Sequence, residues 1–171
     1  RFSIGLNLGL HYLSGAITYD PLVSQVDPLE ASLIVLLDSL ITNIDRTARN
    51  TNMLIWKREL WLIDHGASLY FHHSWTNWEA QAQRLFPMVK QHVLLPRATA
   101  LTEAADAIRS LVKKEDLEEI VAVIPDTWLS EEGNDMTPEQ KREAYVSFLW
   151  TRLRNLDQLT KEAADAREAG L

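Results

Sequence analysis

Apolar residues recur at helical spacing directly after an Asp-Pro pair. Asp27 suits the capping position of a helix and Pro28 its first turn, where the missing proline N–H is no loss. The apolar positions that follow repeat every three or four residues and comprise Leu29, Leu33, Leu36, Leu37, Leu40, Ile41 and Ile44. The pattern predicts a buried helix from Pro28 to about Asn43.

A different pattern begins where this helix ends. The polar run 45–52 leads into two short apolar runs, 53–56 and 60–63, which three charged residues separate. This order predicts a loop, a strand, a tight turn and a second strand. Both strands are almost wholly apolar, so we expect the hairpin to be covered on both faces. The second strand leads into Asp64, and Gly66 permits the turn that follows.

Helical periodicity resumes beyond residue 71. The predicted helices span 75–85, 101–113 and 115–123, and a longer one, capped by Thr137, runs from Pro138 past Leu159. The charged end, 161–171, is expected to fray, and residues 2–19 are expected to be extended with glycine turns. Gly and Pro number only 6 each among 171 residues, which also favours helices. The sequence therefore predicts a single, mainly α domain with a small β-hairpin.

Composition narrows the classes of function. The formal net charge of -7 argues against direct nucleic-acid binding, because such surfaces need clustered Lys and Arg. The longest apolar run, 33–37, is far shorter than the roughly 20 residues that span a bilayer, so we expect no membrane segment. The chain has no cysteine, so oxygen or histidine must hold any metal, and we expect a cytoplasmic location.

Three polar side chains flank the predicted hairpin in an order that suits phosphoryl transfer from ATP. Asp45 lies five residues before Asn50, and Asp64 follows the second strand. In such a reaction one carboxylate faces the acceptor hydroxyl, and oxygen ligands hold Mg²⁺ across the phosphates. Asp45 is therefore the candidate catalytic base, and Asn50 and Asp64 are the candidate ligands of Mg²⁺ and, through it, of ATP. We call Asp45, Asn50 and Asp64 the trio.

The segments around the trio resemble a known family. Residues 45–52 (DRTARNTN) and 60–67 (LWLIDHGA) are similar to the catalytic and metal-binding loops of HipA-like kinases, and more distantly to those of phosphatidylinositol kinases. The resemblance implies a protein-kinase-like C-terminal lobe, with 1–26 as a leading segment near the hinge, 27–71 as the catalytic part and 72–171 as a helical subdomain. It also implies transfer of the ATP γ-phosphate to a hydroxyl, of a protein Ser or Thr or of a small molecule, and an antitoxin-type protein partner.

The chain departs from ordinary protein kinases at its motifs. Residues 43–45 (NID) and 64–66 (DHG) stand where those kinases have His-Arg-Asp and Asp-Phe-Gly. The first lysine, Lys57, lies downstream of Asp45, and no G-x-G-x-x-G loop occurs, so the groups that grip ATP phosphates are missing. We expect those groups in an N-terminal lobe outside this chain, and we expect the chain alone to be inactive.

Other polar and aromatic residues admit more than one interpretation. Arg46 could contact substrate or phosphate, or it could pair with a nearby carboxylate, whereas Arg49 is interpreted as structural. The remaining candidates are interpreted as packing residues and not as a metal site or a ligand groove: His65, His72 and His73, and the six tryptophans.

Two other functions stay open beside the kinase. A helical interaction module could keep the kinase architecture and work by binding alone, although the intact trio argues against this. A small-molecule or lipid kinase would share the same loops and differ in its acceptor pocket. A surface rich in Lys and Arg beside Asp45 would indicate the lipid kinase.

Overall fold

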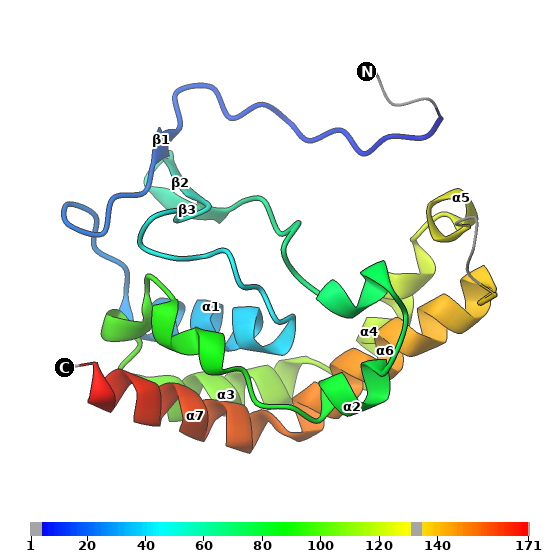
Figure 1. Cartoon of the computed structure of the whole chain (residues 1–171). Coiled ribbons are helices and arrows are strands. Elements are labelled where there is room, and N and C mark those ends of the chain that lie inside the picture. Colours follow the sequence, from blue (N-terminus) through cyan, green and yellow to red (C-terminus); the bar gives the residue numbers. More distant parts are fainter. Residues whose placement is uncertain (1–4, 131–134, 171) are drawn as a thin grey trace.

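A three-stranded antiparallel sheet lies above one end of a larger group of helices (Figure 1). The computed structural model describes residues 5–130 and 135–170. The central strand β2 (Met53–Trp56) pairs with β1 (Ile17–Thr18) on one side and with β3 (Glu59–Leu62) on the other. The prediction of a mainly helical chain with a small hairpin is confirmed. Strand β1 is an addition that the glycine-containing leading segment did not indicate.

The leading segment is extended, as its alternating pattern predicts. It runs across the top of Figure 1 from β1 towards α5 (Asp126–Leu129). There the indole Nε1 of Trp128 donates a hydrogen bond to the carbonyl of Leu6 at 2.9 Å. The backbone φ angles of Gly5 (101°) and Gly15 (79°) lie in the region that glycine favours.

Helix α1 (Pro28–Leu40) forms where it was predicted and is capped as its sequence indicates. The Asp27 carboxylate accepts hydrogen bonds from the backbone N–H groups of Leu29 (2.8 Å) and Glu30 (3.2 Å). The helix stops at Leu40 and not near Asn43, because Thr42 holds a left-handed backbone with a φ of 55°. The chain therefore enters the loop that contains Asp45 earlier than predicted.

The hairpin of β2 and β3 turns through Lys57 and Arg58, which both have positive φ angles (51° and 71°). Two such residues form a type I′ turn, whose twist matches that of the strands but which favours Asn and Gly. The predicted burial of both faces is wrong. Side chains of β3 alternate between exposed and half-buried, and Trp61 keeps 37% of its surface exposed.

We expect Arg58→Gly to stabilise the protein by roughly 0.5–1 kcal/mol. A left-handed backbone costs an L-residue about 1–2 kcal/mol, and the greater chain entropy of unfolded glycine offsets about 0.4–1 kcal/mol of that gain. Arg58→Ala is the matched control, because it removes the same exposed side chain and keeps the Cβ. Urea denaturation should show a higher midpoint for glycine alone. A midpoint for Arg58→Gly at or below that of Arg58→Ala would contradict the prediction, because the relief of strain would then not exceed the entropy cost of glycine.

The helices that follow the sheet differ from the prediction mainly in where they end. They are α2 (Trp78–Ala82), α3 (Leu101–Leu111), α4 (Lys114–Ala122), α5, α6 (Pro138–Arg154) and α7 (Leu156–Ala169). Short 3-10 helices lie between them at η1 (Tyr70–His73), η2 (Pro87–Gln91) and η3 (Leu95–Arg97). Helix α2 is shorter than the predicted 75–85, because Trp75 and Asn77 have left-handed φ angles of 56° and 52°.

The predicted long C-terminal helix is two helices, α6 and α7, which meet at Asn155. Thr137 caps α6 as predicted, in a reciprocal arrangement with Gln140. Fraying of the charged end is wrong for its described part, because α7 stays helical to Ala169. Leu159 and Ala163 hold this helix against the core.

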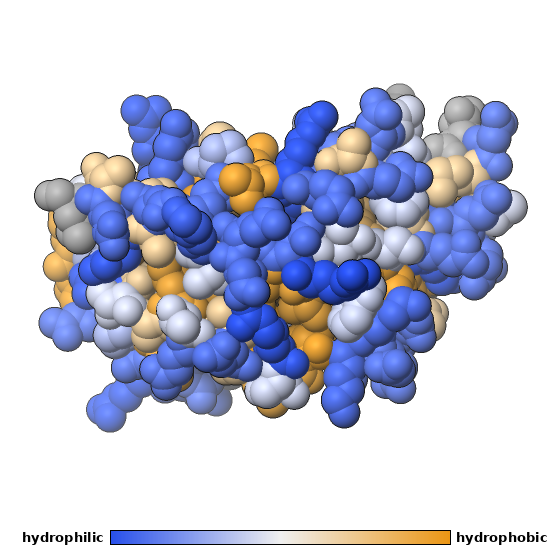
Figure 2. Space-filling view, turned by 90° about the horizontal axis from the view of Figure 1, so that it is seen from below, coloured by the Kyte–Doolittle hydropathy of each residue, from blue (hydrophilic) through white to orange (hydrophobic). Residues whose placement is uncertain are grey.

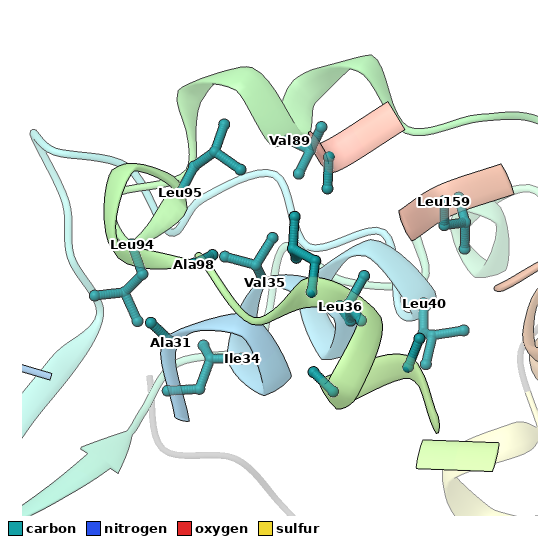
Figure 3. Close-up of a cluster of buried hydrophobic side chains, with 14 of the residues drawn as sticks. Ala31, Ile34, Val35, Leu36, Leu40, Val89, Leu94, Leu95, Ala98 and Leu159 are labelled. Carbon is teal, nitrogen blue, oxygen red and sulfur yellow. The ribbon is translucent and has the colours of Figure 1, made fainter. Parts of the chain in front are cut away.

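The main core lies between α1, α3, α7 and the 3-10 segments η2 and η3 (Figure 3). Val35 and Leu36 of α1 are fully buried among side chains from these elements, including Leu94 and Leu159. The underside of the helices is mostly hydrophilic, with hydrophobic residues visible between the polar side chains (Figure 2). Within residues 5–130 and 135–170, no helix has the length and apolar character needed to cross a bilayer.

Candidate active site

The structure links the two loops that carry the trio. Asp45 lies in the Asp45 loop (residues 41–52), and the amide Nδ2 of Asn50 donates to its Oδ2 at 2.8 Å. Asp64 lies in the Asp64 loop (residues 63–68), just after β3. The side-chain Nδ2 of Asn52 lies 3.2 Å from Asp45 Oδ2 and 3.4 Å from the backbone carbonyl of Asp64. Asn52 is thus the bridge between the two loops.

The backbone of both loops is held in a conformation that Asn and Asp tolerate. Asn52 and Asp64 have left-handed φ angles of 46° and 50°. The N–H of Ile63 donates to the Asn52 carbonyl at 3.0 Å, which continues the pairing of β2 and β3 into the site. The Oδ1 of Asp64 accepts from the N–H of Gly66 at 3.3 Å, so the turn at this glycine orients the carboxylate.

A cavity of about 580 Å³ lies beside the Asp45 loop, and Asn50 is the member of the trio that lines it. Its lining is Thr18, Tyr19, Asp20, Pro21, Ala48, Arg49, Asn50, Thr51, Asn52, Met53, Leu54 and Ile63. The cavity therefore has an apolar part, from the strands, and a polar part, from the Asp45 loop. Arg49, interpreted from the sequence as structural, is exposed here and forms no ion pair with any described residue.

A larger hollow, of about 880 Å³, lies between η2 and α7 and shares no lining residue with this cavity. Its charged groups have both signs and lie among apolar side chains; they are Lys90, Lys161, Glu162 and Asp165. We place the site at the smaller cavity, because Asn50 and Asn52 line it and the amides of both donate to Asp45 Oδ2.

Arg46 does not join the trio at the cavity. Its side chain is 1% exposed, and its Nε lies 2.5 Å from Oδ2 of Asp38, a fully buried residue of α1. Of the two sequence interpretations of Arg46, pairing with a carboxylate is the one that the structure contains. Arg46 therefore does not serve as a contact for substrate or phosphate in this arrangement.

Asp38 is the centre of a buried polar network behind the Asp45 loop. His92 accepts a hydrogen bond from the Leu94 N–H at its Nδ1 (3.1 Å), so its Nε2 carries the proton and donates to Asp38 Oδ2 at 2.9 Å. Asn43 Nδ2 donates to the other oxygen, Oδ1, at 3.1 Å. The Asn43 Oδ1 in turn accepts from the N–H of Asp45 at 3.2 Å. The network therefore supports the backbone at Asp45.

The charges of this network are set by burial and by its hydrogen bonds. Burial alone would raise the pKa of the Asp38 carboxyl, but hydrogen bonds from His92 and Arg46 outweigh it and hold the pKa below the ordinary 3.8. Burial of the ring and the nearby Arg46 charge lower the pKa of His65 from its ordinary value. Asp38 is therefore a carboxylate and His65 a neutral acceptor at neutral pH.

The donor set of the trio fits Mg²⁺ bound together with a nucleotide. Asp64 offers a carboxylate, and Asn50 keeps its amide Oδ1 available because it bonds Asp45 through Nδ2. The described residues contain no cluster of three or more His, Cys, Asp or Glu that could hold a metal by themselves. Mg²⁺ is commonly held by one or two protein oxygens plus phosphate and water oxygens, which is what this set can supply.

The aromatic residues pack at the margin of the core. His72 Nδ1 lies 3.0 Å from the Tyr145 hydroxyl, within a cluster of rings around Phe71. None of the six tryptophans, all of them in the described ranges, is fully buried, and Trp128 is 42% exposed. The interpretation of the tryptophans as packing residues is confirmed for Trp75, Trp78 and Trp150, which pack against the core.

The comparisons with known proteins place the chain in a family. No curated protein and no solved structure matches it. A family model described as HipA-like kinase matches residues 14–158, which contain the whole trio and both loops. The chain belongs to the HipA-like kinase family.

Proposed function

We propose that this chain is the C-terminal part of an ATP-dependent kinase that transfers the γ-phosphate to a hydroxyl, of a protein Ser or Thr. The observation that supports this most is the convergence of the trio: Asn50 bonds Asp45 at 2.8 Å, and Asn52 links Asp45 to the Asp64 backbone. Membership of the HipA-like kinase family supports the same class of reaction.

Asp45 is the proposed base that orients the acceptor hydroxyl and takes its proton. Its Oδ2 accepts from both Asn50 and Asn52, and no described residue donates to its Oδ1. The two amides fix the plane of the carboxylate, so the Oδ1 lone pairs can face an incoming hydroxyl. In phosphoryl transfer such positioning, with removal of the proton, supplies much of what the protein contributes.

Asn50 and Asp64 are the proposed residues that would hold Mg²⁺. When bound there, Mg²⁺ would supply positive charge to offset the negative charge that develops on the phosphate during transfer. The 580 Å³ cavity is the proposed place of the nucleotide, with its half-buried apolar residues (Pro21, Leu54 and Ile63) against the base and Arg49 towards the phosphates. We propose that an N-terminal lobe supplies the remaining phosphate contacts.

The proposal is tested with the full-length protein from the same gene and γ-labelled ATP. We expect label to enter an acceptor in total cell protein when Mg²⁺ is present, and not when EDTA is added. Separate incubations with total lipid and with small metabolites distinguish a protein acceptor from the other two. If nothing is labelled and calorimetry detects no Mg²⁺-dependent ATP binding, the helical interaction module becomes the better interpretation.

The remaining expectations are part of the same proposal. A cytoplasmic kinase with an antitoxin-type protein partner fits the family, and isolation of the full-length protein from its own cells with its bound partners would test the partner. The chain alone should transfer little phosphate, because the cations expected to grip the nucleotide lie outside it.

A further inference from the structure

Arg46 follows Asp45 in the sequence, and all three nitrogens of its guanidinium contact other groups of the protein. Nε bonds Asp38 Oδ2 of α1, Nη1 bonds the backbone carbonyl of Asn52 at 2.5 Å, and Nη2 lies 3.0 Å from Nε2 of His65. One planar group therefore contacts the helix below the site, the end of the Asp45 loop and the Asp64 loop.

Only one of these three contacts places the positive charge of Arg46 next to a negative charge, that of Asp38. The carboxylate of Asp38 is met by Nε of Arg46 and is further satisfied by His92 and Asn43. The two terminal nitrogens of Arg46 point the other way, at groups that carry no negative charge. A guanidinium is rigid and presents its donors in a fixed fork, so it sets the spacing of the groups that it bonds.

The groups that the two terminal nitrogens of Arg46 contact are bonded to, or adjacent to, residues of the trio. The Asn52 carbonyl accepts from Arg46 and from Ile63, while the Asn52 amide lies on Asp45 Oδ2 and on the Asp64 carbonyl. His65 is the immediate neighbour of Asp64. A shift of the Arg46 fork would therefore move the proposed base and the proposed metal ligand relative to each other.

We propose that Arg46 is a positioning residue that sets the distance between the Asp45 loop and the Asp64 loop, and so the geometry of the bound metal. The inference rests on the proposed function for its role in catalysis, but the mechanical link between the loops does not depend on that function. A lysine at this position could keep the charge on Asp38 but could not reach all three partners.

The experiment uses the full-length protein with three substitutions. Arg46→Lys keeps the cation, His65→Leu removes the acceptor in the Asp64 loop, and His65→Gln offers a side-chain oxygen that can accept in place of Nε2. Arg154→Lys, at an exposed position of α6, is the matched control for the arginine substitution. Two quantities are measured: hydrogen–deuterium exchange of the segment 62–68, and the Mg²⁺ concentration that half-saturates phosphate transfer.

We expect Arg46→Lys and His65→Leu each to speed hydrogen–deuterium exchange in segment 62–68 and to leave exchange in α7 unchanged. Each should also raise the half-saturating Mg²⁺ concentration about tenfold or more, because loss of a residue that supports a metal ligand typically weakens metal binding by that much. His65→Gln should retain more Mg²⁺ affinity than His65→Leu. Combining Arg46→Lys with His65→Leu should cost little more than Arg46→Lys alone, because that substitution already breaks the contact that His65→Leu removes.

Two results of the exchange measurement would contradict the positioning role of Arg46. Unchanged exchange in segment 62–68 of Arg46→Lys would overturn the proposal, as would faster exchange spread evenly over the whole chain, which is the mark of general destabilisation. If the wild-type protein transfers no phosphate, the proposed function fails, and the exchange data still establish or refute the link between the loops.

Discussion

Asp45→Asn in the full-length protein should reduce the rate of γ-phosphate transfer by about 10²–10⁴-fold, the range that loss of a general base produces. An asparagine at this position keeps the size of the side chain and can still meet Asn50 and Asn52, but it cannot take the proton of the acceptor hydroxyl. Affinity for Mg²⁺-nucleotide should change little, because Asp45 is not a proposed ligand.

Asp64→Asn should reduce transfer at least as strongly, and for a different reason. It removes the one anionic oxygen proposed to hold Mg²⁺, so binding of the metal and nucleotide together should weaken while metal-free nucleotide binding stays the same. Calorimetric titrations with and without Mg²⁺ separate the two variants. Glu103→Gln, at an exposed position of α3, is the control for loss of one negative charge.

The contrary results are distinct for each carboxylate. Transfer by Asp45→Asn within a few-fold of the wild-type rate would remove Asp45 from the role of base. Equal Mg²⁺ dependence of nucleotide binding in Asp64→Asn and Glu103→Gln would remove Asp64 from the metal site. A loss of the same size in all three variants would point to net charge as the cause.

The parts of the fold that sequence predicts well are those set by neighbouring residues. Asp27 and Pro28 locate the start of α1 through cap hydrogen bonds that close within three residues. Thr137 does the same for α6. The meeting of Asp45 and Asn50 is also local, since they are five positions apart in one loop. Short-range chemistry of this kind leaves few alternatives for the chain.

The sequence patterns did not predict contacts between residues that lie far apart in the chain. His92 reaches Asp38 across 54 residues, and only the tertiary fold brings the residue after η2 against α1. One signal was available: Asp38 is an acid in an otherwise apolar stretch of α1, and a buried carboxylate needs partners. Arg46 is the nearest cation in sequence, so its pairing inside the protein could have been favoured over a phosphate contact.

The predicted helix ends were wrong where single residues take left-handed backbone. Thr42, Trp75 and Asn77 interrupt helices although two of them are not typical of that conformation. Trp75 packs edge-on against Phe71, and Thr42 lies just after α1. Periodicity cannot report such interruptions, because the apolar spacing continues through them.

Arg152→Met should lower the free energy of unfolding by about 3–5 kcal/mol, a large share of a typical total of about 5–15 kcal/mol. Arg152 of α6 is 1% exposed and donates to the carbonyls of Ser39 (2.7 Å) and Leu40 (2.9 Å) at the end of α1 and of Arg84 (2.8 Å) just after α2. Carbonyls at helix ends lack partners within the helix, so one cation here serves two helices.

Methionine fills much of the same space but donates nothing, so these carbonyls would stay buried without partners. Burial of the guanidinium already lowers its pKa to about 10, which shows how little water reaches this position to replace Arg152. Arg154→Met, two residues along the same helix but exposed, is the control. Urea denaturation of both variants measures the difference, and unfolding free energies within 1 kcal/mol of each other, on the order of one ordinary hydrogen bond, would refute the double capping role.

Because α1 leads directly into the Asp45 loop, the loss of the hydrogen bonds from Arg152 should also affect the position of Asp45. Arg152 bonds the last carbonyl of α1, and the N–H of Leu69, beyond the Asp64 loop, donates to the carbonyl of the next residue, Ile41, at 2.8 Å. We therefore expect Arg152→Met to lower transfer activity near its unfolding midpoint more steeply than the folded fraction alone requires. An activity that follows the folded fraction throughout would confine Arg152 to stability.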